Sequence, residues 1–185
     1  MTGQVSDEFR YNSETYALVG IDGEGLYTAH DLGLEARPAS TACWRGYQMV
    51  YDCRDGKLVL DMMNVNTHNP ISINGVEPTK GDWMFSHIYE NLNLQTKFTG
   101  SILLGKDFID AMYVHMGFQS AESYRTVIEI EVKDGFIIRE TDVSSTMEER
   151  RRSRKGKPTA PPSMEDDDIH SWIVDRFSQD YKSDE

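Results

Sequence analysis

The amino-acid sequence predicts a β-rich α+β protein whose strands form an antiparallel curled sheet or open barrel built from hairpins. Two observations support this fold class: short apolar runs that alternate with polar residues, and Asp-Gly or Asn-Gly turns between such runs. Segments with helical periodicity are scarcer, so only one or two short helices are expected beside the sheet. At 185 residues, the chain is long enough to bury one substantial core.

The chain divides by composition into four segments. A flexible N-terminal segment is expected over residues 1–12, and a single β-rich globular domain over 13–150. Residues 151–168 combine a basic cluster, a proline-rich stretch and an acidic cluster, which predicts a disordered linker. Residues 169–182 regain an apolar pattern and are expected to form an amphipathic docking helix.

Two Asp-Gly pairs mark the most clearly predicted hairpins. Asp55-Gly56 separates the runs YQMVYDC and KLVLDMM, in which apolar residues alternate as in a half-buried strand. Asp134-Gly135 separates VIEIEV from FII in the same way. The likeness of the two turns leaves a duplicated half-domain open as an alternative, although hairpins favour Asp-Gly for backbone reasons alone.

A third hairpin is predicted near the start of the domain, where residues 16–21 would pair with 25–30 through the glycine-rich turn Asp22–Gly25. Asn74-Gly75 predicts a further tight turn. The remaining apolar runs that complete the predicted sheet lie at residues 83–89 and 98–104.

Two helices are predicted within the domain. Asp107 can cap a helix that ends at Gly117, although a strand is the alternative for this segment. The apolar face of this helix would consist of Phe108, Ile109, Met112 and Met116. Ser145 and Glu148 have the spacing of a capping box, which predicts a short helix at the end of the domain.

The C-terminal helix is expected to dock through an apolar stripe that Asp168 is placed to cap. The stripe residues recur at three- and four-residue steps and are Ile169, Trp172, Ile173, Phe177 and Tyr181. A helix this short is marginal in water by itself, so the stripe needs a surface to cover it. Docking on its own domain, docking on a partner, and disorder are the three open outcomes.

The net charge and the cysteines set limits on partners and compartment. A formal net charge of −12 disfavours binding to nucleic acid or anionic membranes and favours a protein partner with a basic or apolar surface. The basic run Arg150–Lys157 is the one place where a nucleic-acid contact could form, although a solvated linker is its commoner meaning. No signal-peptide core or membrane-spanning run is found, so a cytoplasmic location is expected. Cys43 and Cys53 are expected to be free thiols.

The sequence contains no motif of an established catalytic, cofactor or metal site. Cys43 is followed by Trp44, but the next residues predict a strand rather than the helix N-terminus that would stabilise a thiolate. The histidines and cysteines lack zinc-ligand spacing, and no phosphate loop or dinucleotide fingerprint is found. We therefore expect no cofactor, no metal and no enzymatic activity.

A polar-aromatic stretch is the best candidate for a binding surface on the domain itself. Its side chains combine apolar area with a polar tip, as interface anchors do, although many of them are also expected in the core. The candidates are Trp83, Phe85, His87, Tyr89, Tyr113 and His115.

Together these features favour a non-catalytic protein-protein interaction module that binds through its β-rich domain and its tethered helix. Small acidic cytosolic proteins of this build include regulators and inhibitors in bacterial defence or conflict systems, an analogy of class rather than of motif. The alternative is a calycin-like β-barrel that encloses a small apolar ligand.

Overall fold

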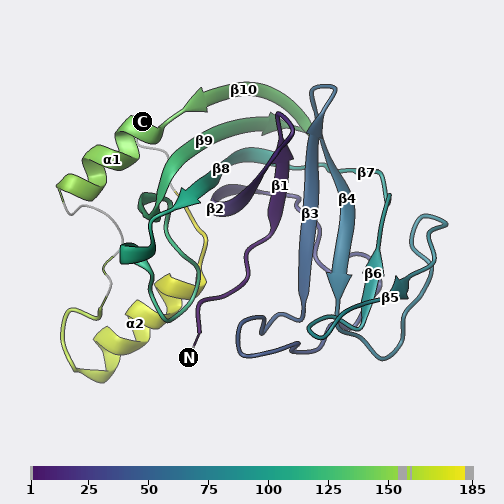
Figure 1. Ribbon diagram of the computed structural model, residues 1–185, viewed down its shortest axis with the longest axis horizontal. Coiled ribbons are helices and arrows are strands. Elements are labelled where there is room, and N and C mark those ends of the chain that lie inside the picture. The colour runs from purple at the N-terminus through teal and green to yellow at the C-terminus, as the bar shows by residue number, and fades with distance from the viewer. Residues whose placement is uncertain (1, 154–157, 159, 182–185) are drawn as a thin grey trace.

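The computed structural model of the protein describes residues 2–153, 158 and 160–181. Within these residues, ten strands form one sheet, accompanied by two α-helices and two short 3-10 helices (Figure 1). The strands are β1 (Glu8–Tyr11), β2 (Glu14–Glu24), β3 (Tyr47–Arg54), β4 (Lys57–Val65), β5 (Thr79–Lys80), β6 (His87–Tyr89), β7 (Leu94–Gln95), β8 (Thr99–Phe108), β9 (Tyr124–Lys133) and β10 (Phe136–Asp142). The helices are η1 (Asp110–Met112), η2 (Ala121–Ser123), α1 (Ser144–Arg152) and α2 (Asp166–Phe177). The predicted β-rich α+β class is confirmed.

Seven of the strands curl into a barrel-like sheet in the order β10-β9-β8-β2-β1-β3-β4, and β10 returns to β4 to close it. Neighbouring strands are antiparallel except β1 and β3, which run parallel. At the closure, the Leu58 N–H donates to the Gly135 carbonyl and the Ile137 N–H to the Gly56 carbonyl, each at 2.9 Å. Both predicted Asp-Gly hairpins are confirmed, and backbone hydrogen bonds join the two turns to each other.

Side chains fill the inside of the barrel. Alternate residues of each strand point inward, and large ones such as Phe9 and Tyr51 are fully buried there, as is Phe98 just before β8. Phe9 stacks on Tyr51 with the two ring centroids 4.8 Å apart. The interior is a packed core in the described residues, so the structure lends no support to the small-ligand alternative.

A second apolar cluster lies on the outer face of β2, β8 and β9. Leu103 and Val127 belong to it, because their neighbours along β8 and β9 point into the barrel. Met147 of α1 and Ala121 of η2 cover these side chains from outside. Figure 1 shows α1 and α2 outside the barrel, on the side where β8 and β9 lie.

The N-terminal segment departs from the sequence prediction. Residues 1–12 are predicted to be flexible, yet Glu8–Tyr11 form β1, which lies between β2 and β3 in the sheet. Phe9 is 0% exposed, so this strand contributes to the core. The prediction fails because the pairing of β1 with β3 joins residues about forty positions apart, which no local pattern reveals.

The predicted hairpin of residues 16–21 with 25–30 is wrong, because β2 continues through the expected turn and pairs with β8. Gly23 lies opposite Gly100 of β8. A Cβ atom on Gly23 would lie 2.3 Å from the Thr99 carbonyl oxygen. Glycine here allows two strands to approach closely and does not make a turn.

The helix predicted between Asp107 and Gly117 is also wrong. β8 continues to Phe108, which pairs with Tyr124 of β9, and Asp107 has a φ of 60°. The described chain then forms only the single 3-10 turn η1. Tertiary strand pairing overrides the helical periodicity of this segment.

The other local predictions are confirmed with shifted boundaries. Ile73 and Val76 bridge across the Asn74-Gly75 turn. The first of the two remaining apolar runs holds only the short strand β6, whereas the second lies within β8 except for its first residue, Phe98. α1 forms where the capping box predicts a helix, but it begins at Ser144, whose N–H donates to Asp142 Oδ1 at 2.9 Å.

Candidate functional site

An exposed tryptophan lies on the loop between β5 and β6. Trp83 is 82% exposed. Asp82 Oδ1 accepts the N–H groups of Met84 at 2.8 Å and Phe85 at 3.0 Å, and these bonds from Phe85 and Met84 lower the pKa of the Asp82 carboxyl. The buried Phe85 ring anchors the loop from beneath. The loop therefore presents a large aromatic side chain from a fixed backbone.

A second exposed tryptophan lies on the loop before β3. Trp44 is 58% exposed, and its Nε1–H donates to the Thr41 carbonyl at 2.9 Å. This loop and the Trp83 loop meet at the end of β4. There the Asn66 N–H donates to the Gly46 carbonyl at 2.8 Å, and the Thr67 N–H donates to Ser86 Oγ at 3.1 Å.

A third loop with exposed aromatic side chains lies between η1 and η2. Gln4, near the N-terminus, connects this loop to the Trp44 loop. Gln4 accepts the Trp44 N–H on Oε1 at 3.1 Å, and the Gln4 N–H donates to the Gly117 carbonyl at 2.8 Å. In that loop, Tyr113 contacts His115 edge to face, with the ring centroids 4.7 Å apart. Both rings are exposed. Figure 1 shows the loop before β3 at the lower ends of β3 and β4, and the loop between β8 and β9 further to the left, beside α2.

We call these four exposed side chains, Trp44, Trp83, Tyr113 and His115, the aromatic rim. The predicted domain surface divides between this rim and the core. Phe85 and Tyr89 are buried, and Tyr89 donates its hydroxyl to the Ile71 carbonyl at 2.8 Å. His87 is half-buried, with Nδ1 lying 2.8 Å from Ser86 Oγ. The sequence prediction missed Trp44, because tryptophan at a strand start is as common in a core as at a surface.

The predicted docking helix lies on its own domain. α2 begins at Asp166, three residues before the predicted start, and Glu165 occupies the N-cap position instead of Asp168. The helix ends at Phe177, so Tyr181 lies beyond it and not in the helix as predicted. The five predicted stripe residues are all half-buried: Ile169, Trp172, Ile173, Phe177 and Tyr181. The chain is anchored at the end of α2, where the Phe118 N–H donates to the Arg176 carbonyl at 2.7 Å and Arg176 Nη2 to the Phe118 carbonyl at 2.9 Å.

The first arginines of the basic run are used within the fold. Arg150 forms an ion pair with the buried Glu122, with Nε and Oε1 3.1 Å apart. Arg151 Nη1 donates to the carbonyls of Glu122 and Tyr124 at 2.6 and 3.1 Å. Residues 154–157, which complete the run, lie outside the described residues. These contacts hold α1 to η2 and β9.

The chemistry around Cys43 differs from that of an activated nucleophile. The thiol is buried and donates to the Tyr47 carbonyl, with Sγ 3.5 Å from the oxygen. Burial raises the pKa of the Cys43 thiol, so the thiolate is disfavoured. Neither cysteine is in a disulfide.

No group of acidic, histidine and cysteine side chains in the described part of the chain is arranged to hold a metal ion. Of the helices within residues 2–153 and 160–181, none is long and apolar enough to cross a membrane. Comparison of the chain with protein-family models, with curated proteins and with solved structures finds no match.

Proposed function

We propose that the protein is a non-catalytic interaction module that binds a partner protein through the aromatic rim. The observation that carries the proposal is Trp83, whose indole is 82% exposed on a loop held by two hydrogen bonds to Asp82. Tryptophan is the residue most enriched among interface hot spots. A preformed loop reduces the ordering cost of binding, since less backbone freedom is lost in the complex.

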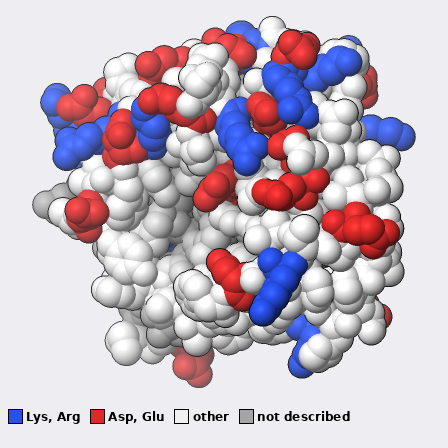
Figure 2. Space-filling view, turned by 45° about the vertical axis from the view of Figure 1, so that its right-hand side comes forward, with Lys and Arg blue, Asp and Glu red and all other residues white. Residues whose placement is uncertain are grey.

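The chemistry of the rim favours a partner with an apolar pocket or an exposed cation. Indole and phenol rings offer apolar area, and their faces attract a lysine or arginine side chain. In Figure 2, acidic and basic side chains gather over the upper part of the face, whereas the lower left is largely uncharged and the surface between them is hollowed. The net charge of −12 would also speed encounter with a basic protein.

A regulatory or inhibitory role would follow if the partner is an enzyme or a toxin. The rim would then act by covering a functional surface of the partner, which needs no catalytic group on this chain. Full-length protein that inhibits the captured partner in an activity assay would support this role.

The first prediction concerns Trp83. Affinity capture with the full-length protein should yield a stoichiometric protein partner, and Trp83→Ala should weaken its binding at least tenfold, because a hot-spot truncation costs about 2 kcal/mol or more. Titration of the purified partner by calorimetry measures the change.

Phe136→Ala is the matched control, because Phe136 is also an exposed aromatic side chain but lies at the opposite end of β3 and β4, beside the Asp-Gly turns. This control should bind like the wild type. If no protein partner is captured, or if Trp83→Ala and Trp44→Ala both bind as tightly as Phe136→Ala, the proposal is wrong.

A further inference from the structure

The chain following α2 pairs with an uncovered part of the β2 edge. β1 pairs with β2 along Glu14–Ala17, and the Leu18 N–H donates to the Asp7 carbonyl, so β1 leaves the edge of β2 uncovered beyond Leu18. The Ile21 N–H donates to the Gln179 carbonyl, and the Tyr181 N–H donates to the Ile21 carbonyl, both at 2.8 Å. Gln179 Nε2 also donates to the Leu18 carbonyl at 2.6 Å. Residues 178–181, which we call the tail, thus join the edge of β2 through one isolated parallel bridge between Ile21 and Asp180.

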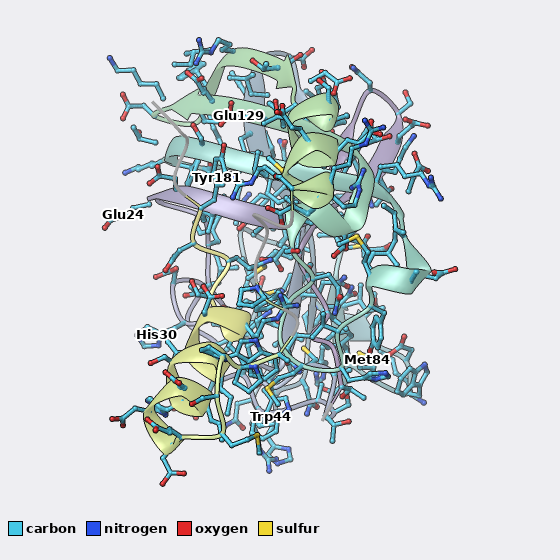
Figure 3. The ribbon with its side chains drawn as sticks, turned by 90° about the vertical axis from the view of Figure 1, so that its left-hand side faces the viewer. Glu24, His30, Trp44, Met84, Glu129 and Tyr181 are labelled. Atoms are coloured by element: carbon cyan, nitrogen blue, oxygen red, sulfur yellow. The ribbon has the colours of Figure 1, made fainter. Side chains whose placement is uncertain are left out.

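Tyr181 packs against Gly20, which has no side chain and so leaves room for it. A Cβ atom on Gly20 would lie 3.0 Å from both the Tyr181 Cβ and the Leu103 Cδ1, so a larger residue would crowd the tail and the β8 side chain beneath it. The Tyr181 ring crosses the outer face of the sheet toward β9, where its hydroxyl lies 3.4 Å from Glu129 Oε1. Figure 3 shows this arrangement, with Tyr181 below Glu129 and the tail rising from α2.

The tail forms one wall of a pocket that it does not fill. The pocket has a volume of about 240 Å³ and lies between the tail, η2 and α1. Its floor is apolar and comes from Val19, Leu103 and Met147, all buried members of the outer cluster. The Glu122–Arg150 ion pair also lines the pocket, so the space beside the tail has an apolar floor and a polar wall.

We propose that this edge of β2 and the adjoining pocket form a docking site for an extended segment of a partner protein, and that the tail is its built-in, displaceable occupant. The segment that fits would carry an apolar side chain for the pocket and a hydrogen-bond donor opposite Glu129. The site lies on the outer face of the barrel, and its existence does not depend on the function proposed for the rim.

The nature of the contacts supports exchange. The two bonds at Ile21 join backbone to backbone, so any extended segment can make them. Each hydrogen bond contributes only about 0.5–1.5 kcal/mol net, which makes local opening of the tail much cheaper than unfolding of the barrel. The anchor at Arg176, whose side chain is 1% exposed, can stay in place while the tail opens.

Amide hydrogen exchange of the full-length protein tests whether the tail opens. Ile21 and Ile102 are cross-strand neighbours, but the Ile21 amide is bonded to the tail, whereas β8 is paired on both sides by β2 and β9. Ile21 should exchange at least about a hundredfold faster than Ile102. Equal protection of the two amides would overturn the proposal.

Binding of a synthetic peptide of residues 176–181 tests whether the site accepts a separate segment. Full-length Tyr181→Ala should bind this peptide at least tenfold more tightly than the wild type, whose own tail competes at an effective concentration in the millimolar range. Adding Gly20→Val to Tyr181→Ala should abolish peptide binding. Val174→Ala is the matched control, because Val174 lies on α2 before the tail and is 55% exposed, and it should behave like the wild type.

Two results would overturn the proposal. One is peptide binding to Tyr181→Ala that is undetectable up to about 1 mM or unaffected by Gly20→Val. The other is a wild-type dimer in which copies exchange tails, which would make a second copy the occupant. Loss of partner binding in Trp83→Ala bears on the rim alone, so the two proposals fail separately.

Discussion

At the scale of single residues, burial determines both which aromatic side chains can bind and which thiols can react. Trp83 and Phe85 are two positions apart, yet one is the most exposed aromatic residue of the rim and the other lies in the core. The sequence identifies both residues as candidates but does not show which one is exposed, because the turn at Asp82 sets the direction of each side chain. Cys53, in β3, is half-buried as a free thiol.

The titration of Cys53 predicts loss of stability at alkaline pH. Burial, followed by the charge of Asp52, raises the pKa of Cys53 from 9.0 to about 12. The folded state therefore binds this proton more tightly than the unfolded state, so the contribution to stability is complete below pH 9 and falls as the pH approaches 12. The slope from one such group is at most about 1.4 kcal/mol per pH unit.

Urea unfolding of the wild type and of Cys53→Ala, at about pH 8 and at about pH 10.5, measures this effect. The wild type should lose more free energy of unfolding between the two pH values than the variant does. Equal losses would assign the alkaline sensitivity to other groups, such as Tyr124, whose pKa burial raises to about 12.

At the scale of elements, the two Asp-Gly hairpins show how a local signal acquires a long-range role. Each turn forms as its sequence predicts, since Asp and Gly in these turns have positive φ values. The contact between the turns, in contrast, depends on the curl of the whole sheet. Only the folded barrel shows that β4 and β10 meet there.

The two turn glycines should therefore differ in their tolerance of a side chain. A Cβ atom on Gly135 would lie 2.0 Å from the Thr96 carbonyl oxygen, at a φ of +80°, whereas one on Gly56 would have no atom within 4 Å, at a φ of +68°. Gly135→Ala should cost about 3 kcal/mol or more of unfolding free energy, because strain and a backbone clash add.

Gly56→Ala serves as the control and should cost only about 1 kcal/mol, the strain of a positive φ alone. Chemical denaturation of both variants compares the costs. Similar losses for the two substitutions would mean that Gly135 does not lie against the Thr96 carbonyl as described.

At the scale of the whole molecule, β1 completes the sheet between β2 and β3. Its parallel pairing with β3 brings a short polar segment of the N-terminus into the barrel. Beside it, Arg45 donates to Asp7 at 2.6 and 3.0 Å, and Asp7 also accepts the Met49 N–H at 2.7 Å. The N-terminal residues are thus part of the cooperative fold.

Phe9→Ala tests this role of β1. Because Phe9 is 0% exposed and stacks on Tyr51, its truncation should lower the free energy of unfolding by about 3–5 kcal/mol. Phe136→Ala, at a position 49% exposed, should cost no more than about 0.5 kcal/mol in the same thermal or urea unfolding experiment. A small loss for Phe9→Ala would show that β1 is dispensable, as expected of a flexible segment.

The sequence alone determined the features that depend on neighbours along the chain. These are the β-rich class, the Asp-Gly hairpins, the helix at α1, the helical segment after the linker, and a list of aromatic side chains with interface chemistry. Backbone preferences and short-range periodicity act over a few residues, so they can be read directly from sequence.

Tertiary structure decided everything that depends on contacts between distant residues. Strand pairing explains three differences from the sequence prediction. It places β1 in the sheet, it carries β2 straight through the predicted turn opposite Gly100, and it extends β8 into the segment predicted as a helix. The aromatic rim and the tail site likewise assemble from loops and termini far apart in sequence. Hydrogen bonding and burial across the barrel outweigh local propensity, which spans only about 1 kcal/mol per residue.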